Sequence, residues 1–187
     1  IMDDILVGKY LQYDDQDWIR PKGKKGKINL INASSGQQES LPMLLALSVW
    51  PKIYVKEIEG SFIFIEEPEA HLFPNAQGHI ISIISLLYSN LSTNFFLSSH
   101  SPYIISALNN LILAGDLSND GKLTSEEFTE INGSGVPIDF EHVSAYFICD
   151  GHTNSIIDEE YRMIGGEVLD EVSEHFERTM NKLLLCK

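Results

Sequence analysis

Cysteine is scarce in this sequence, with only Cys149 and Cys186 among 187 residues. Their separation matches neither a disulfide framework nor a zinc motif, so we expect both to be reduced thiols. No apolar run approaches the roughly 18 residues that a membrane-spanning helix needs, and the chain does not open on a basic and then apolar leader. These absences predict a soluble, cytoplasmic protein that does not insert into a membrane.

Positive charge is also in short supply. Thirteen lysines and arginines face 27 acidic residues, which gives a net charge of −14 and argues against nucleic-acid binding by general electrostatics. One local exception is the stretch RPKGKKGK at residues 20–27, where the basic residues are Arg20, Lys22, Lys24, Lys25 and Lys27. It is either a solvated hairpin turn, with glycines supplying backbone freedom, or a contact for phosphate or DNA.

The order of apolar runs predicts an α/β fold. Residues 1–33 alternate short apolar runs, at 5–13 and 27–33, with turn clusters, as antiparallel hairpins do. A helix of about four turns then follows Ser34 or Ser35, either of which could cap it. Buried strands at 62–65 and 94–99 flank a helix at 76–91, and this βαβ order implies a mainly parallel sheet with helices on both faces.

The remaining segments complete one domain. We expect a helix at 103–114, a third strand at 144–150 and a closing helix at 167–185. The predicted organisation is a single domain of four consecutive parts: the antiparallel segment 1–33, the core 34–115, a polar insertion 116–136 and an α/β tail 137–187.

Both core strands end in polar residues. Glu66 and Glu67 follow the first strand directly, and Ser98, Ser99 and His100 end the second. Two adjacent carboxylates at the end of a buried strand are costly unless a cation or a reacting group shares the site. Because ligands bind at the carboxyl edge of parallel strands, we expect His100 to lie within reach of Glu67 if the strands are neighbours.

Three stretches together resemble a known family. They are INASSGQQES (31–40), FIFIEEPEAHLFP (62–74) and FFLSSHSPYIISAL (95–108). In that order they resemble the signature motif, the Walker B strand with its D-loop, and the switch-histidine loop of ABC-type ATPase heads. The closest resemblance is to RecF-like and OLD-like bacterial ATPases, a group that includes phage-defence proteins, and it covers roughly residues 5–115.

The resemblance implies ATP and Mg²⁺ as cofactors and a role for each matching residue. Glu66 takes the position that supports magnesium, Glu67 that of the carboxylate that orients and deprotonates the attacking water, and His100 that of the γ-phosphate sensor. The signature positions fall on Ser34, Ser35, Gly36 and Gln37. In such families the signature faces ATP held by a second head, so the implied assembly is a homodimer that drives or gates an effector, such as a nuclease.

The sequence departs from the family pattern in three places. The metal position carries Glu66 instead of aspartate, and the D-loop aspartate is replaced around His71, Leu72 and Phe73. A phosphate loop of the form G-x-x-x-x-G-K-[ST] is absent from the 187 residues. The chain should therefore not hold the β and γ phosphates alone, and we expect it to be the carboxy-terminal part of a longer ATPase whose other part carries that loop.

A second motif competes with this interpretation. Residues 116–127, DLSNDGKLTSEE, fit the loop of a calcium-binding EF-hand. Its candidate calcium ligands are Asp116, Ser118, Asp120, Lys122 and Glu127. No second loop accompanies it, so the stretch is either a calcium site or a polar surface insertion of similar composition. The alternative function is thus a non-hydrolysing regulatory or structural module with a calcium-binding loop.

Overall fold

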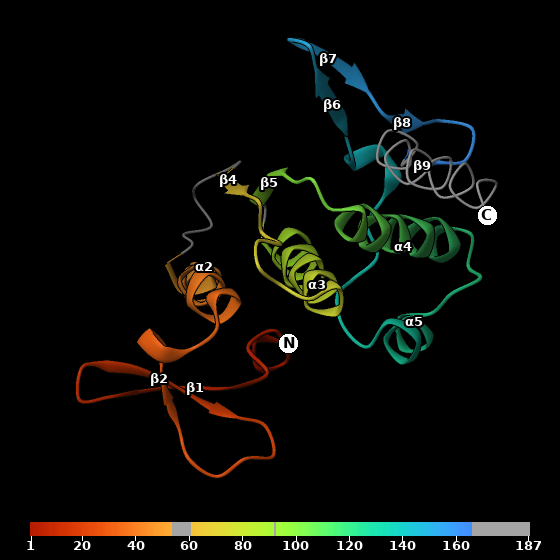
Figure 1. Ribbon diagram of the computed structural model, residues 1–187. Coiled ribbons are helices and arrows are strands. Elements are labelled where there is room, and N and C mark those ends of the chain that lie inside the picture. Colours follow the sequence, from red (N-terminus) through yellow and green to blue (C-terminus); the bar gives the residue numbers. More distant parts are fainter. Residues whose placement is uncertain (54–60, 92, 166–187) are drawn as a thin grey trace, which may run out of the picture.

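The computed structural model describes residues 1–53, 61–91 and 93–165 (Figure 1). The helices are α1 (Met2–Ile5), α2 (Ser35–Ile53), α3 (Pro74–Asn90), α4 (Pro102–Asn119) and α5 (Ser125–Asn132), with short 3-10 turns η1 (Leu30–Asn32) and η2 (Phe140–His142). The strands are β1 (Gly8–Tyr13), β2 (Gln16–Pro21), β3 (Ile28–Asn29), β4 (Ser61–Glu66), β5 (Thr93–Ser98), β6 (Tyr146–Cys149), β7 (His152–Ser155), β8 (Ile157–Asp158) and β9 (Met163–Ile164). Among these residues no helix is long and apolar enough to cross a bilayer.

Strands β4 and β5 form the parallel pair that positions the candidate site. They run side by side from the pair Ser61 and Thr93 to the pair Glu66 and Ser98, and α3 connects them. The predicted βαβ unit and the α/β fold class are therefore confirmed. Because the two strands are parallel and in register, both polar termini lie at the same edge of the sheet.

The two faces of this pair differ. Ile65 and Leu97 pack against the main hydrophobic core, whose buried members on the helices include Leu41, Leu44, Ile80, Ile81, Ile84, Ile104 and Leu111. On the other face Phe62, Phe64 and Phe96 are 61%, 72% and 57% exposed. We expected a sheet covered on both faces, whereas the described residues cover only one.

Helix boundaries follow the capping residues of the sequence. Ser34 caps α2: its Oγ accepts a hydrogen bond from the Gln37 amide, and the Gln37 side chain accepts one from the Ser34 amide. Ser101 caps α4 by accepting from the Tyr103 amide, and proline occupies the first position of both α3 and α4, where its missing N–H costs nothing. These local signals explain why the polar loops that follow β4 and β5 turn directly into helices.

The amino-terminal segment is antiparallel, as predicted, with β2 between β1 and β3. Two of its boundaries differ from the prediction. Residues 2–5 form the helix α1 instead of the start of a strand, and the strand expected at 27–33 is only two residues long. It ends there because the Asn29 side chain accepts a hydrogen bond from the Ile31 amide and starts the 3-10 turn η1.

The third strand predicted at 144–150 does not join the parallel pair. Its residues form β6, which pairs antiparallel with β7 through Asp150 and Gly151, both in the left-handed region as tight hairpin turns require. In Figure 1 this hairpin and the β1–β2 hairpin lie at opposite ends of the molecule. Cys149, at the end of β6, is exposed. The closing helix predicted at 167–185, with Cys186 after it, lies outside the described residues.

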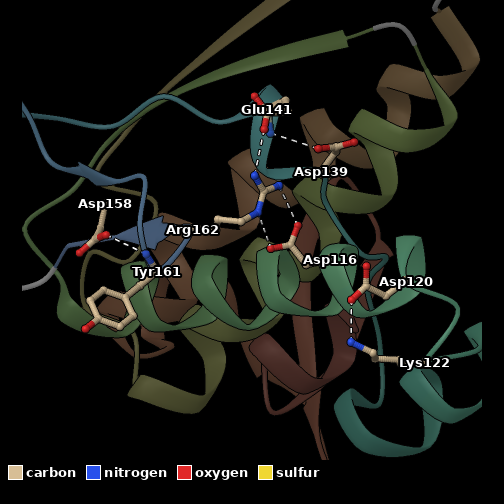
Figure 2. Close-up of polar contacts among 8 residues, drawn as sticks. All are labelled: Asp116, Asp120, Lys122, Asp139, Glu141, Asp158, Tyr161 and Arg162. Atoms are coloured by element: carbon tan, nitrogen blue, oxygen red, sulfur yellow. Dashed lines mark hydrogen bonds and ion pairs between the residues drawn. The ribbon is translucent and has the colours of Figure 1, made fainter.

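An arginine joins the β8–β9 hairpin to helix α4 (Figure 2). The Arg162 guanidinium donates two hydrogen bonds of 2.9 Å to the two carboxylate oxygens of Asp116, and a third of 3.0 Å to Glu141. Its centre also lies 4.5 Å from the ring centroid of Phe140. Bidentate arginine–carboxylate pairs fix geometry as well as supply energy, so this contact holds the carboxy-terminal hairpin on α4.

Two glycines provide a matched test of the packing. A Cβ on Gly115 in α4 would lie 2.1 Å from the Ile138 carbonyl oxygen, whereas a Cβ on Gly78 in α3 would meet nothing within 4 Å. We expect Gly115→Ala to lower the free energy of unfolding by about 1–3 kcal/mol through overpacking. Gly78→Ala should raise it by up to about 1 kcal/mol, because alanine is the better helix former. Urea denaturation measures both, and equal effects would contradict this packing.

The Asp116–Arg162 contact predicts a dependence of stability on pH. Hydrogen bonds from Arg162 hold the pKa of the Asp116 carboxyl below its ordinary value of 3.8. The stabilisation is therefore fully present above pH 3.8 and is lost as the pH falls through the lower pKa of the folded state. Asp116→Asn should lower the urea midpoint more at neutral pH than at a pH below 3.8, because the wild-type carboxyl becomes protonated as the pH falls. A deficit of the same size at both pH values would contradict this assignment.

Candidate functional site

Glu67 and His100 meet at the carboxyl edge of the β4–β5 pair. The Glu67 carboxylate lies 3.5 Å from the His100 Nδ1, and both side chains are exposed, at 51% and 72%. The expectation that parallel neighbours would bring these residues together is confirmed. An acid and an imidazole that are close to each other and open to solvent can both reach a ligand bound at this edge.

The backbone of Glu67 adopts an uncommon conformation. Its φ is +44°, in the left-handed region that a residue with a Cβ rarely occupies. The Glu67 amide donates a hydrogen bond of 2.9 Å to the Ser98 carbonyl, and the Glu67 carbonyl accepts one from the Ala70 amide. These bonds extend the strand pairing by one residue and hold the turn. Such conformations cost free energy and concentrate at functional sites.

Glu66 lies on the open face of the parallel pair. It is the register partner of Ser98, and both are exposed on the same face as Phe64 and Phe96. A carboxylate beside a hydroxyl suits Mg²⁺, which proteins usually hold through one or two side-chain oxygens together with substrate phosphates. Among residues 1–53, 61–91 and 93–165, no three His, Cys, Asp or Glu residues form a complete metal site. The Glu66 carboxylate and the Ser98 hydroxyl are nevertheless oxygen donors of the kind that Mg²⁺ accepts.

Glu69 is a buried member of the site that the sequence reasoning did not assign. The residue is only 4% exposed. Its Oε1 accepts a hydrogen bond of 2.6 Å from the Ser99 hydroxyl and one of 3.0 Å from the His100 amide. The same oxygen lies 3.8 Å from the His100 Nδ1. The available signal was a third acid in EEPE, three residues after Glu66 and in a turn that faces the end of β5.

The polar contacts continue from this carboxylate into the core. The Ser99 hydroxyl accepts from the Ser101 amide at 3.0 Å, and the Ser101 hydroxyl donates to the Gln77 side chain at 2.5 Å. Gln77 in turn donates to the Leu72 carbonyl at 3.0 Å. Ser101 and Gln77 are 6% and 7% exposed. The loops after β4 and β5 are therefore joined through a buried network as well as through strand pairing.

The signature-like residues 34–37 lie at the start of α2. Ser34 and Gln37 cap the helix, and the Gln37 side chain also donates to the Leu6 carbonyl at 2.6 Å. Gly36 lies against the turn at His71, where a Cβ would approach the His71 carbonyl oxygen to 2.5 Å. The His71 Nε2 also lies 3.4 Å from the Glu39 carboxylate. The close approach of Gly36 to the turn at His71 thus leaves no room for a larger residue.

The calcium-loop residues are placed differently from an EF-hand. Asp116 and Ser118 are part of helix α4, and Asp116 is bound to Arg162 (Figure 2). Asp120 pairs with Lys122 at 2.7 Å, and Glu127 forms a capping box with Thr124 at the start of α5. Four of the five predicted calcium ligands, Asp116, Asp120, Lys122 and Glu127, thus form contacts within the protein. The stretch forms a helix end, a turn and a helix cap.

The basic turn at residues 20–27 also uses part of its charge internally. Lys22 forms an ion pair with Asp4, and this contact lowers the pKa of Asp4 to about 2. The ammonium of Lys27 lies 4.5 Å and 4.1 Å from the ring centroids of Tyr13 and Trp18. Two of the five basic side chains thus stabilise the hairpin, which favours the structural interpretation of this turn.

Comparisons with known proteins agree with the α/β fold. The AAA ATPase domain family matches residues 3–105, more than half of the chain. A chain from a structural study of ATP-driven dimerization and DNA-stimulated activation of SMC ATPases aligns with a TM-score of 0.52 and 9% sequence identity, covering 89% of this chain and 80% of that one. At this identity the similarity concerns the fold alone. No curated protein sequence matches the chain. On the family match, which spans the Glu67–His100 site, the chain belongs to the AAA ATPase domain family.

Proposed function

We propose that this chain is the lobe of an ABC-type ATPase head that supplies the water-activating carboxylate and the phosphate-sensing histidine for ATP hydrolysis. The observation that carries the proposal is the 3.5 Å approach of Glu67 to His100 at the carboxyl edge of two adjacent parallel strands. The left-handed φ of Glu67 supports it, because strain is retained where it serves a site.

Each side chain has a distinct task in this proposal. The Glu67 carboxylate orients the attacking water and accepts its proton, while His100, which can donate a hydrogen bond from its ring, contacts the terminal phosphate. Glu66 and Ser98 would hold Mg²⁺ through their side-chain oxygens on the open face. Bound ATP·Mg²⁺ supplies the scissile phosphoanhydride and neutralises charge on the phosphate oxygens. Positioning and electrostatics account for most of such catalysis, which suits a site with few groups.

The phosphate loop must come from polypeptide outside these 187 residues, because the motif is absent from them. The open face of the β4–β5 pair is the place where we propose that this polypeptide packs. Phe62 and Phe64 have ring centroids 6.3 Å apart, and Phe64 and Phe96 5.5 Å apart, so the three rings form one apolar patch. Parallel sheets are normally covered on both faces, and Glu66 at the end of the patch would then adjoin the phosphates.

The proposed working unit is a pair of heads in the cytoplasm. Ser34, Ser35, Gly36 and Gln37 at the start of α2 would face the nucleotide of the partner head, as the resemblance to ABC-type heads implies. Local features support this proposal: the segment is capped, exposed at Ser34 and Ser35, and begins a helix of 19 residues. Helix amino termini favour anions. In this proposal, ATP hydrolysis by the pair of heads drives or gates an effector such as a nuclease, in phage defence or DNA maintenance.

The direct test of the function is Glu67→Gln in the full-length protein. Removing the proton acceptor should reduce ATP turnover by about 10²-fold or more, while ATP affinity stays within a few-fold because the side chain keeps its size. Steady-state hydrolysis and equilibrium titration with labelled ATP measure the two quantities. Glu130→Gln, the same change at an exposed site on α5, is the matched control. Unchanged turnover in Glu67→Gln defeats the proposal.

The proposed covering of the open face is tested with Phe64→Asp. A carboxylate in the middle of a buried apolar patch is strongly unfavourable, so ATP binding by the full-length protein should weaken by about tenfold or more. Ile131→Asp introduces the same charge at a side chain that is 77% exposed on α5 and should leave ATP binding unchanged. Equal affinity in the two variants would show that the phenylalanine face stays open when ATP binds.

A further inference from the structure

We infer that Glu69 is the positioning residue that holds the His100 loop in place for ATP hydrolysis. This inference rests on the proposed function for its catalytic consequence, but its structural part can be tested independently. Glu69 follows the proposed catalytic Glu67 by two residues in the turn after β4. It is therefore placed to couple the two loops that carry the proposed catalytic groups.

Glu69 contacts the first residues of the loop that follows β5. One oxygen accepts from both the Ser99 hydroxyl and the His100 amide, at 2.6 and 3.0 Å. The amide belongs to the residue whose ring approaches Glu67. A hydrogen bond to that amide fixes the Cα of His100, and with it the origin of the side chain, relative to the turn after β4.

Burial makes the arrangement costly unless it has a role. The second oxygen, Oε2, is fully buried and has no hydrogen-bond partner among the described residues. A buried carboxylate with an unpaired oxygen destabilises a fold, and each such group in a native structure calls for an explanation. Ser101 and Gln77 nearby are also buried and are hydrogen-bonded to each other. The His100 loop is therefore bound by Glu69 at Ser99 and His100 and by Gln77 at Ser101.

Exposed His100 needs such support. Its side chain is 72% exposed, so packing does not restrict the ring, and its position depends on the backbone below it. Small displacements of a catalytic group can reduce turnover by about 10²-fold. Glu69 would therefore affect the rate of hydrolysis without touching the nucleotide, which distinguishes it from Glu67 and His100.

The first arm of the experiment measures amide hydrogen exchange at His100 in the full-length protein without nucleotide. Glu69→Ala removes the acceptor and should speed exchange of this amide by about 10- to 100-fold, the range expected for a hydrogen bond to a charged acceptor. Glu69→Gln retains an acceptor oxygen and should keep most of the protection. Glu130→Gln on exposed α5 is the matched control for the loss of a carboxylate. Unchanged exchange in Glu69→Ala overturns the inference, whether or not the protein hydrolyses ATP.

The second arm measures ATP turnover and ATP affinity in the same variants. Glu69→Ala should lower kcat by about 10- to 100-fold with affinity changed by less than about threefold, and Glu69→Gln should restore most of kcat. Because Glu69 acts through His100, the double variant Glu69→Ala/His100→Ala should be no slower than His100→Ala alone. A purely structural defect would instead add to the loss in the double variant and would lower affinity as well, and that result overturns the inference.

The two arms separate failure of this inference from failure of the proposed function. If wild type and Glu67→Gln turn over ATP equally, the proposed function fails and the catalytic part of the inference fails with it. If Glu67→Gln is inactive but Glu69→Ala retains wild-type kcat, the function stands and the positioning role is overturned. Thermal unfolding of every variant identifies any that do not fold. If Glu69→Ala is one of them, Glu69→Leu, which fills more of the buried space but also lacks the acceptor of the His100 amide, replaces it with the same expectations in both arms.

Discussion

The parallel pairing of β4 with β5 is the interaction on which the site depends. It aligns Glu66 with Ser98, so the two loops that follow leave the sheet at the same edge, and Glu67 and His100 converge although they are 33 residues apart in the sequence. Shifting the register by one residue would reverse the faces of the strands. It would place the phenylalanines in the core and separate the acid from the imidazole.

Three further sets of contacts hold the helices and loops around this strand pair in place. Buried Ile and Leu side chains hold α3 and α4 against one face of the strands. A proline begins each of these helices, and a serine also caps α4. The Glu69 network joins one loop to the other. The candidate catalytic side chains themselves remain exposed. The strands and helices that carry the site are thus packed in the core, whereas the Glu67 and His100 side chains are open to solvent. A site that receives a nucleotide needs this combination.

The sequence predicted those parts of the molecule that local patterns determine. The positions of the two parallel strands, the βαβ order and the Glu67–His100 proximity followed from apolar runs and from polar residues at the strand ends, whereas the exposed phenylalanine face did not. Other features depend on contacts between distant residues. The sequence pattern around Asp116 fits a calcium loop, but in the structure its carboxylate binds Arg162, which lies 46 residues later in the chain. The contacts of Glu69 likewise come from Ser99 and the His100 amide, 30 and 31 residues later. The strand at 144–150 differs from the prediction for a local reason: the Asp150–Gly151 turn forms a hairpin with the next strand.

The most direct measurement is an experimental structure of the full-length Glu67→Gln protein bound to ATP and Mg²⁺. The account predicts that the terminal phosphate lies at the carboxyl edge of β4 and β5, with His100 in contact with it and a water molecule beside residue 67. It also predicts that a glycine- and lysine-containing loop covers the phenylalanine face. Nucleotide bound elsewhere on the molecule, or a phosphate that neither His100 nor residue 67 approaches, would contradict the account.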